Sequence, residues 1–237
     1  MSILLALDSS TDVMALALVG PGGMAFHESA GGAQASERLV PEAMALLARA
    51  GLQLSDLDAI AFGRGPGAFT GLRTACAVVQ GLAFGAAKPV LSIDSLMLVA
   101  EDARLQALAE AAPLDGPIWV AMDARIGEIY AAAYRFDATG WITLDAPALY
   151  SPAALIVRWQ SPQAVAGSAL SVFADQLGQP PRSWPATVSR ARALAALAEA
   201  AWLRGEVLDA GDALPVYVRD KVAQTTAERA AARAVAG

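Results

Sequence analysis

Residues 4–18, LLALDSSTDVMALAL, decide the fold, because residues 119–133, WVAMDARIGEIYAAA, repeat their layout. In both stretches a short apolar run ends in an acid, Asp8 or Asp123, and a second apolar run follows a turn. Short apolar runs bounded by turn residues are typical of buried β-strands. A layout that occurs twice in one chain predicts two similar α/β domains side by side.

Working outward from each stretch, we expect the same order of elements, three strands followed by alternating helices and strands (βββαβαβα). In the first copy we predict helices at 37–50, 69–86 and 96–111, the first of them capped by Ser36. In the second copy we predict helices at 152–159, 171–177 and 191–204, and a short strand at 185–188 before the last helix. Each copy is then a mixed five-stranded sheet with helices. The predicted domains are residues 1–112 and 113–223, and residues 224–237 form a frayed or disordered tail.

Composition excludes several classes of protein. The 237 residues are 56% hydrophobic and carry a net charge of −6, which argues against a stand-alone nucleic-acid binder. A single cysteine allows no internal disulfide and fits a reducing compartment. The first ten residues, MSILLALDSS, contain no basic residue, so we do not expect a signal peptide there, and the longest apolar run, residues 74–87, is too short to span a bilayer. We therefore predict a soluble, cytoplasmic protein without a membrane partner.

The duplicated strand, acid and turn resemble the superfamily of actin, sugar kinases and heat-shock ATPases. In that superfamily such turns embrace ATP phosphates, and their glycines let the backbone come close to them. Here the first turn lacks glycine, the second has lost its glycine pair, and the turn that would meet adenosine keeps one. The residues of these degenerate turns are Asp8, Ser9, Ser10 and Thr11 in the first turn, Asp123 in the second, and Gly167 in the turn that would meet adenosine. A structural role for both acids is favoured, and a nucleotide-binding role is the alternative.

A glycine-rich stretch, GRGPGAFTGLRTACAVVQGLAFG, occupies residues 63–85. It has no lysine and therefore cannot be a Walker A loop, and its loose G-x-G spacing is a weak dinucleotide signal. Pro66 also removes a backbone donor that a phosphate would need. We predict a tight structural turn from strand to helix, made by Gly63, Arg64, Gly65, Pro66 and Gly67.

Taken as a whole, the segment GRGPGAFTGLRTACAVVQGLAFGAAKPVLSIDSL resembles the hallmark segment of the bacterial TsaB family. ILLALDSSTDVMALAL, ERLVP, VAMDARIGEIYAAAY and LPVYVRDKVA match other blocks of that family, up to about residue 223. The resemblance implies two tandem actin-like (ASKHA, RNase H-like) domains. It also implies a non-catalytic partner of the TsaD transferase, which makes threonylcarbamoyladenosine at the tRNA adenosine next to the anticodon.

The resemblance and the residues together predict no catalytic or metal site. In TsaD, metal ligands include a His-x-x-x-His pair on the first helix, but this chain has Ala35, Ser36, Leu39 and Val40 in that region. Its only histidine, His27, lies in a predicted strand, and one histidine cannot build such a site. This argues against both transferase and metallopeptidase activity. Cys76, in an apolar helix, is predicted to be a buried structural thiol.

The helix at 69–86 is apolar nearly all round, so that we expect both of its faces to be buried. One face packs in the core, and the other is small enough for a partner helix to approach closely. The resemblance points to the same use, because TsaB proteins meet TsaD, or a second copy of themselves, through their first two helices. The predicted interface is Leu39, Ala43, Phe69, Arg73, Thr74, Ala77, Val78, Gly81 and Gly85. For Arg64 and Arg73 we favour structural or interface roles.

The sequence therefore predicts an accessory subunit without an intrinsic cofactor. By resemblance, TsaD is its partner, the TsaE ATPase joins a larger complex, and a homodimer forms in isolation. ATP or ADP would be bound by the partners or at the complex interface, and tRNA would be held mainly by the partners. The alternatives are a small-molecule kinase or ATPase that uses Asp8 and Asp123, a catalytic transferase or metallopeptidase, and a self-sufficient homodimer.

Overall fold

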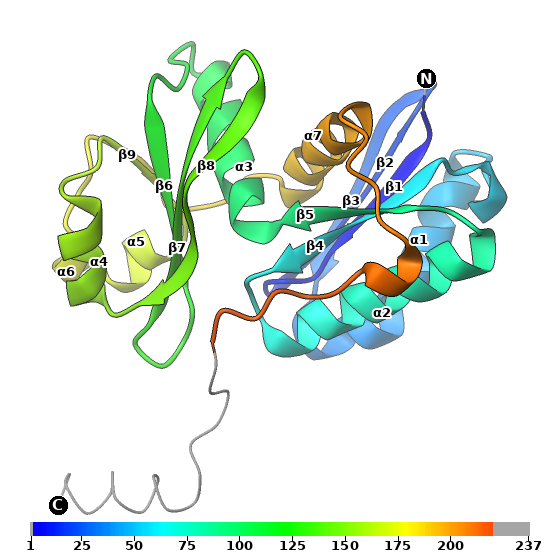
Figure 1. Cartoon of the computed structure of the whole chain (residues 1–237), viewed down its shortest axis with the longest axis horizontal. Coiled ribbons are helices and arrows are strands. Elements are labelled where there is room, and N and C mark those ends of the chain that lie inside the picture. Colours follow the sequence, from blue (N-terminus) through cyan, green and yellow to red (C-terminus); the bar gives the residue numbers. More distant parts are fainter. Residues whose placement is uncertain (1, 220–237) are drawn as a thin grey trace, which may run out of the picture.

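The computed structural model describes residues 2–219, which build two five-stranded sheets (Figure 1). The first sheet comprises β1 (Leu4–Asp8), β2 (Val13–Gly20), β3 (Gly23–Ala30), β4 (Ala59–Gly65) and β5 (Val90–Asp94). The second comprises β6 (Pro117–Asp123), β7 (Ile129–Asp137), β8 (Gly140–Tyr150), β9 (Ala164–Ala166) and β10 (Arg182–Trp184).

Both sheets have the same topology, which confirms the predicted repeat. The strand order is β3-β2-β1-β4-β5 in the first sheet and β8-β7-β6-β9-β10 in the second. In each, three antiparallel strands form a meander, and two further strands extend the sheet in parallel from its first strand. The central strands β1 and β6 end at Asp8 and Asp123, so that both acids lie at the carboxyl end of a sheet.

Helices cover both faces of the first sheet. α1 (Ala35–Arg49) and α2 (Phe69–Ala86) lie on one face, and α7 (Arg190–Leu203) lies on the other (Figure 1). β1 is buried on both faces as a result, because Leu5 and Leu7 pack in the α1/α2 core whereas Leu4 and Ala6 pack in the α7 core. Strands buried on both faces read as continuous apolar runs, which explains the LLAL sequence.

The last helix of each copy crosses to the sheet of the other copy. α3 (Ser95–Ala109) follows the first sheet, but its Val99 packs with Val120 and Tyr134 of the second. α7 follows the second sheet, but its Ala198 packs on the first. The smaller helices α4 (Pro152–Trp159), α5 (Ala169–Val172) and α6 (Ala174–Leu177) accompany the second sheet.

This exchange crosses the predicted domain boundary at 112. α3 packs mainly with the second sheet, although its Leu98 lies in the core of the first, and α7 packs mainly with the first. After α7, Leu208 bridges to Val90 of β5, η3 (Ala210–Asp212) lies beside α2, and Val216 N donates to Arg64 O at 2.7 Å. The end of the predicted second domain, residues 220–223, and the predicted tail, residues 224–237, lie outside the described residues.

Several predicted element boundaries shift. α1 begins at Ala35 and runs through Pro41, so that Ser36 is not its cap. The helix predicted at 171–177 is two short helices that meet at Phe173. The last strand of the second sheet is Arg182–Trp184 and not 185–188, because these residues pair with β9 and place Trp184 in the core.

None of the helices in residues 2–219 is both long enough and apolar enough to cross a membrane.

Candidate functional site

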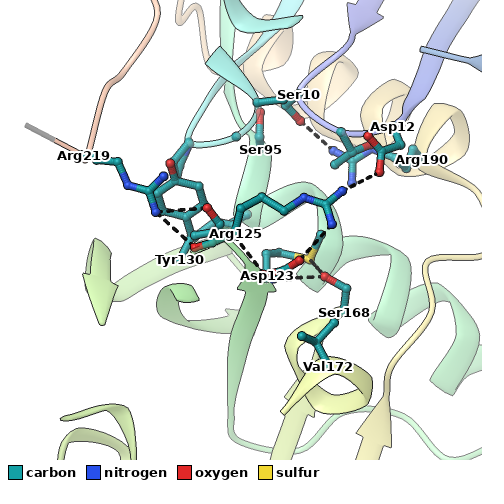
Figure 2. A pocket seen from close by; sticks show the side chains of 17 residues that line it. Ser10, Asp12, Ser95, Asp123, Arg125, Tyr130, Ser168, Val172, Arg190 and Arg219 are labelled. Atoms are coloured by element: carbon teal, nitrogen blue, oxygen red, sulfur yellow. Dashed lines mark hydrogen bonds and ion pairs between the residues drawn. The ribbon is translucent and has the colours of Figure 1, made fainter. Parts of the chain in front are cut away.

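A cleft of about 370 Å³ lies where the carboxyl ends of the two central strands meet (Figure 2). The turn after β1 and the start of α2 form one side, and the turn after β6 with α5 forms the other. Of the residues singled out in the sequence, Ser10, Thr11, Asp123 and the turn at Pro66 line this cleft. Arg125, Arg190 and Arg219 also line it.

The first acid is buried and already partnered. Asp8 has no exposed surface, and its Oδ1 accepts from Arg190 Nη2 at 3.0 Å and from Ser10 Oγ at 2.9 Å. Ser95 Oγ donates to the other oxygen at 3.2 Å. Arg190, on α7, is itself only 4% exposed. A buried carboxylate whose oxygens are engaged by a guanidinium and two hydroxyls favours a structural role for Asp8.

The glycine-rich stretch closes tightly over this first turn. A Cβ added at Gly63 would overlap the Asp8 carboxylate, one at Gly67 would overlap Ser10 O, and one at Gly71 would overlap Ser9 O. Gly65 has a φ of 105°, which favours glycine. Ser9 Oγ also donates to Gly71 O at 2.8 Å. The glycines therefore let the turn and α2 pack backbone to backbone.

The second acid is held by the turn that follows it. Asp123 Oδ1 accepts from Arg125 N at 2.9 Å, and Asp123 N donates to Ser168 Oγ at 3.1 Å. Gly167 has a φ of 118°, and a Cβ there would overlap Ala121 O. Arg125 then reaches across the cleft, where Nη1 lies 3.2 Å from Asp123 Oδ2 and Nη2 lies 2.9 Å from Asp12 Oδ2 (Figure 2). Arg125 thus pairs with both acids and leaves the three side chains with a net charge of −1.

Arg219 completes the cleft from the carboxyl end of the described chain. Its Nη2 donates to Glu128 Oε2 at 2.6 Å and to Ala124 O at 3.0 Å.

No three His, Cys, Asp or Glu side chains in residues 2–219 come together in a way that could hold a metal ion. His27 lies within β3, and its Nε2 is 3.3 Å from Glu42 Oε2 of α1. The carboxylates around the cleft are engaged by arginines, and this arrangement disfavours acid–base chemistry there.

A second candidate site is the outward face of α2. Ala77, Gly81 and Gly85 are exposed, and a Cβ at either glycine would meet nothing within 4 Å. Phe84 lies on the same helix and is 81% exposed. The opposite face of α2 is buried in the core, through Leu72, Ala75, Cys76, Val79 and Ala83. Thr74 and Val78 lie between these two faces and are half-buried.

Two of the predicted interface residues lie away from this face. Leu39 and Ala43 have no exposed surface and belong to the core, because they are on the side of α1 that faces the sheet. On α1 the exposed apolar residues are instead Val40 and Met44, at 38% and 41%. We define the α1/α2 surface as Val40, Met44, Ala77, Gly81, Phe84 and Gly85.

Phe69 and Arg73 are engaged by the carboxyl-terminal segment of the same chain. The Phe69 and Tyr217 rings lie 5.1 Å apart, and Arg73 stacks 3.9 Å above the Phe69 ring while its Nε donates to Tyr217 Oη at 3.1 Å. Cys76 Sγ donates to Ala213 O at 2.9 Å, and burial raises the pKa of this thiol. Cys76 is thus a buried structural thiol, as the sequence predicts.

Sequence reasoning missed Val40, Met44, Phe84, Arg190 and Arg219. Phe84 follows Gly81 by three positions and could have been found from helical spacing. Arg190 could not, because its partner Asp8 lies 182 positions away and belongs to the other copy of the repeat.

Comparison with known proteins gives a consistent result. A protein-family model described as TsaD, tRNA N6-adenosine threonylcarbamoyltransferase, matches residues 23–182. A curated relative from Escherichia coli K12, tRNA threonylcarbamoyladenosine biosynthesis protein TsaB, is 30% identical over 93% of this chain and 96% of its own length. The Haemophilus influenzae protein of the same description is 40% identical over 54% of this chain and 51% of its own.

Solved structures agree with these relatives. A Pseudomonas aeruginosa protein described as similar to peptidase YEAZ is 37% identical, with a TM-score of 0.81 over 92% of this chain and all of that one. A second structure, YeaZ from the same organism, has a TM-score of 0.79 with the same identity and coverage. The fold is therefore the predicted tandem pair of actin-like domains.

Proposed function

The chain belongs to the TsaB (YeaZ) family, and we propose that it serves the biosynthesis of threonylcarbamoyladenosine on tRNA as a non-catalytic subunit that binds a TsaD-type transferase. Its relatives are described as proteins of this biosynthesis. The finer part of the proposal, that this chain holds the transferase in an active form for the adenosine next to the anticodon, rests on the two sites described above.

The observation that carries the proposal is the α1/α2 surface. Glycines inside a helix cost about 1 kcal/mol each relative to alanine, so two exposed glycines on α2 are not explained by stability. Small residues lower the height of a helix surface and let a second helix approach closely. Phe84 on α2, and Val40 and Met44 on the neighbouring α1, supply exposed apolar area. Exposed apolar area on two neighbouring helices favours an interaction site.

A paralog of the same fold suits this surface. The family model that matches this chain is itself described as the transferase, so the transferase would present a related pair of helices. Helix pairs of similar geometry can pack against each other around an approximate two-fold axis. A stable complex needs about 800 Å² from each partner, which a pair of helices of 15 and 18 residues can supply.

The test is a charged substitution where the monomer has room for it. In Gly81→Glu the new Cβ meets nothing within 4 Å in the monomer, so that the fold should persist while a carboxylate is placed in the interface. Gly22→Glu, in the turn between β2 and β3, is the matched control, because a Cβ there also meets nothing. Each variant is mixed with the TsaD of the same organism at micromolar concentration and examined by size-exclusion chromatography with light scattering.

We expect a one-to-one complex with wild type and with Gly22→Glu, and two separate proteins with Gly81→Glu. Circular dichroism should show that Gly81→Glu is folded. If Gly81→Glu binds TsaD as tightly as the wild type, the α1/α2 surface is not the interface. If the wild type forms no complex with a folded TsaD, the proposed function fails as well.

The remaining partners follow from the same proposal. We propose that the chain forms a homodimer when TsaD is absent, and that the ATPase TsaE joins a larger complex. ATP or ADP would be bound by the partners or at the shared interface, and the partners would hold most of the tRNA, because this chain carries a net charge of −6. We expect it to act in the cytoplasm.

The alternative of a small-molecule kinase or ATPase is disfavoured by the cleft. Asp8 lies under Arg190, and Arg125 engages Asp123. An isothermal titration of the isolated chain with Mg-ATP should give no binding at micromolar concentration, and turnover of ATP by the isolated chain would favour the enzyme.

A further inference from the structure

Arg64 occupies an irregular position in the first sheet. β4 pairs with β5 through Gly63 opposite Ile93 and Gly65 opposite Asp94, so that Arg64 is the extra residue of a β-bulge. Bulges redirect side chains and are enriched beside functional sites. The side chain of Arg64 lines a second cleft, of about 550 Å³, that shares no lining residue with the cleft of Figure 2.

This second cleft is formed by β5, α7, the β8 strand and the segment that follows α7. Met97, Leu197 and Trp141 give it apolar walls. The Trp141 ring is fixed in place, because its Nε1 donates to Glu101 Oε2 at 2.9 Å and its edge meets the rings of neighbouring aromatic residues. A rigid indole at the wall of a cleft is a good contact surface for a planar group.

The other charges that line the cleft already have partners. Asp94 accepts hydrogen bonds from Leu96 N at 2.8 Å, Met97 N at 3.3 Å and Tyr134 Oη at 2.9 Å. Arg204 donates twice to Glu206, from Nε at 2.7 Å and from Nη2 at 3.0 Å.

Arg64 differs from them. Its side chain is half-buried and its charge lowers the pKa of Asp94 in the same cleft, but its guanidinium makes no direct hydrogen bond, and no ion pair within 4 Å, with any residue between 2 and 219. Its donors are therefore open to a bound anion, with which they would form charge-assisted hydrogen bonds.

We propose that this cleft binds a small organic anion, a carboxylate or phosphate ester that carries a planar apolar group. The guanidinium of Arg64 would hold the anionic group, for which its planar fork of donors is suited. Trp141 and Leu197 would contact the planar part. The volume of the cleft falls within the range of small-molecule sites. This proposal is independent of the α1/α2 surface.

The experiment uses the full chain and simple probes of the two parts. The probes are 2-naphthyl phosphate and 2-naphthoate, with 2-naphthol as the probe without charge and inorganic phosphate as the probe without a ring. Binding is measured by isothermal titration and by ligand-observed NMR up to millimolar concentration. We expect both naphthyl anions to bind at least tenfold more tightly than 2-naphthol or phosphate.

The variants separate the anion from the cleft wall. Arg64→Ala should weaken the naphthyl anions roughly ten- to hundredfold, as expected for a charge-assisted hydrogen bond, and leave 2-naphthol unchanged. Arg64→Lys keeps the charge but loses the planar fork of donors, so its affinity for the naphthyl anions should lie between those of the wild type and Arg64→Ala. Arg49→Ala, at the exposed end of α1, is the matched control and should bind like the wild type.

Several results would overturn the proposal. One is the absence of wild-type binding to every probe at millimolar concentration. Another is equal binding of 2-naphthol and the anions. A third is anion binding that is unchanged in Arg64→Ala, or in Arg64→Lys if the alanine variant does not fold. If instead no probe binds but Arg64→Ala weakens association with TsaD, the arginine serves a protein partner and not a small ligand.

Discussion

Replacing Arg190 with methionine is the sharpest test of the account of the first turn. Methionine keeps an unbranched apolar stem of similar length and removes the charge. The Arg190 Nη2 atom lies 3.0 Å from Asp8 Oδ1 and 3.0 Å from Ser10 Oγ, and the two charged side chains are 4% and 0% exposed. Removing one partner of such a buried pair leaves an uncompensated charge, which costs about 3–5 kcal/mol. For a chain of this length that corresponds to a melting temperature lower by roughly 6–20 °C.

The assay is a double-mutant cycle in urea, followed by circular dichroism and tryptophan fluorescence. Asp8→Asn should also destabilise the protein, because it leaves the buried guanidinium of Arg190 without its carboxylate partner. The double variant Arg190→Met/Asp8→Asn should lower the free energy of unfolding by clearly less than the sum of the two single changes, since it buries no charge. Arg192→Met, on the exposed side of α7, is the control and should stay within about 0.5 kcal/mol of wild type.

A cost below about 1 kcal/mol for Arg190→Met, or strict additivity in the cycle, would refute the reasoning. Asp8→Asn that stabilises the protein would also refute it, because that result is typical of an acid kept for function at the expense of stability.

Three further predictions concern the same packing. Gly71→Ala should lower the free energy of unfolding, measured in urea, by roughly 1–3 kcal/mol, because the new Cβ would overlap a backbone oxygen of the first turn. Gly81→Ala should raise it by about 0.8–1 kcal/mol, because alanine is the better helix former and its Cβ meets nothing. Equal effects of the two substitutions would contradict this. Tyr134→Phe should cost about 1–3 kcal/mol at neutral pH, because it removes a donor to the buried Asp94 carboxylate. Burial raises the pKa of Asp94 from 3.8 and the tyrosine hydrogen bond lowers it, so the penalty should shrink as the pH falls through the raised pKa, and a penalty independent of pH would speak against this. Cys76 should react with a thiol reagent at pH 8 far more slowly in the native protein than in urea, because burial raises its pKa; equal rates would place it at the surface.

The repeat could be predicted because both copies have the same local sequence pattern. Apolar runs that end in Asp8 and Asp123 identify the two central strands, and the structure places them at the centre of two sheets of equal topology. The helix spacing of residues 69–86 likewise gave the exact limits of α2. Local periodicity fixes the type of an element and which of its faces is apolar.

What the sequence by itself determined is the set of elements, their order and the buried side of each. Only the tertiary structure decided which apolar faces meet. Leu39 and Gly81 both lie on apolar helix faces, but one faces the sheet and the other faces outward. α3 and α7 exchange sheets, and Arg190 thereby reaches Asp8 across 182 positions of sequence. Hydrophobic burial is non-directional, so periodicity shows that a face must be covered, whereas the geometry of the packed whole selects what covers it.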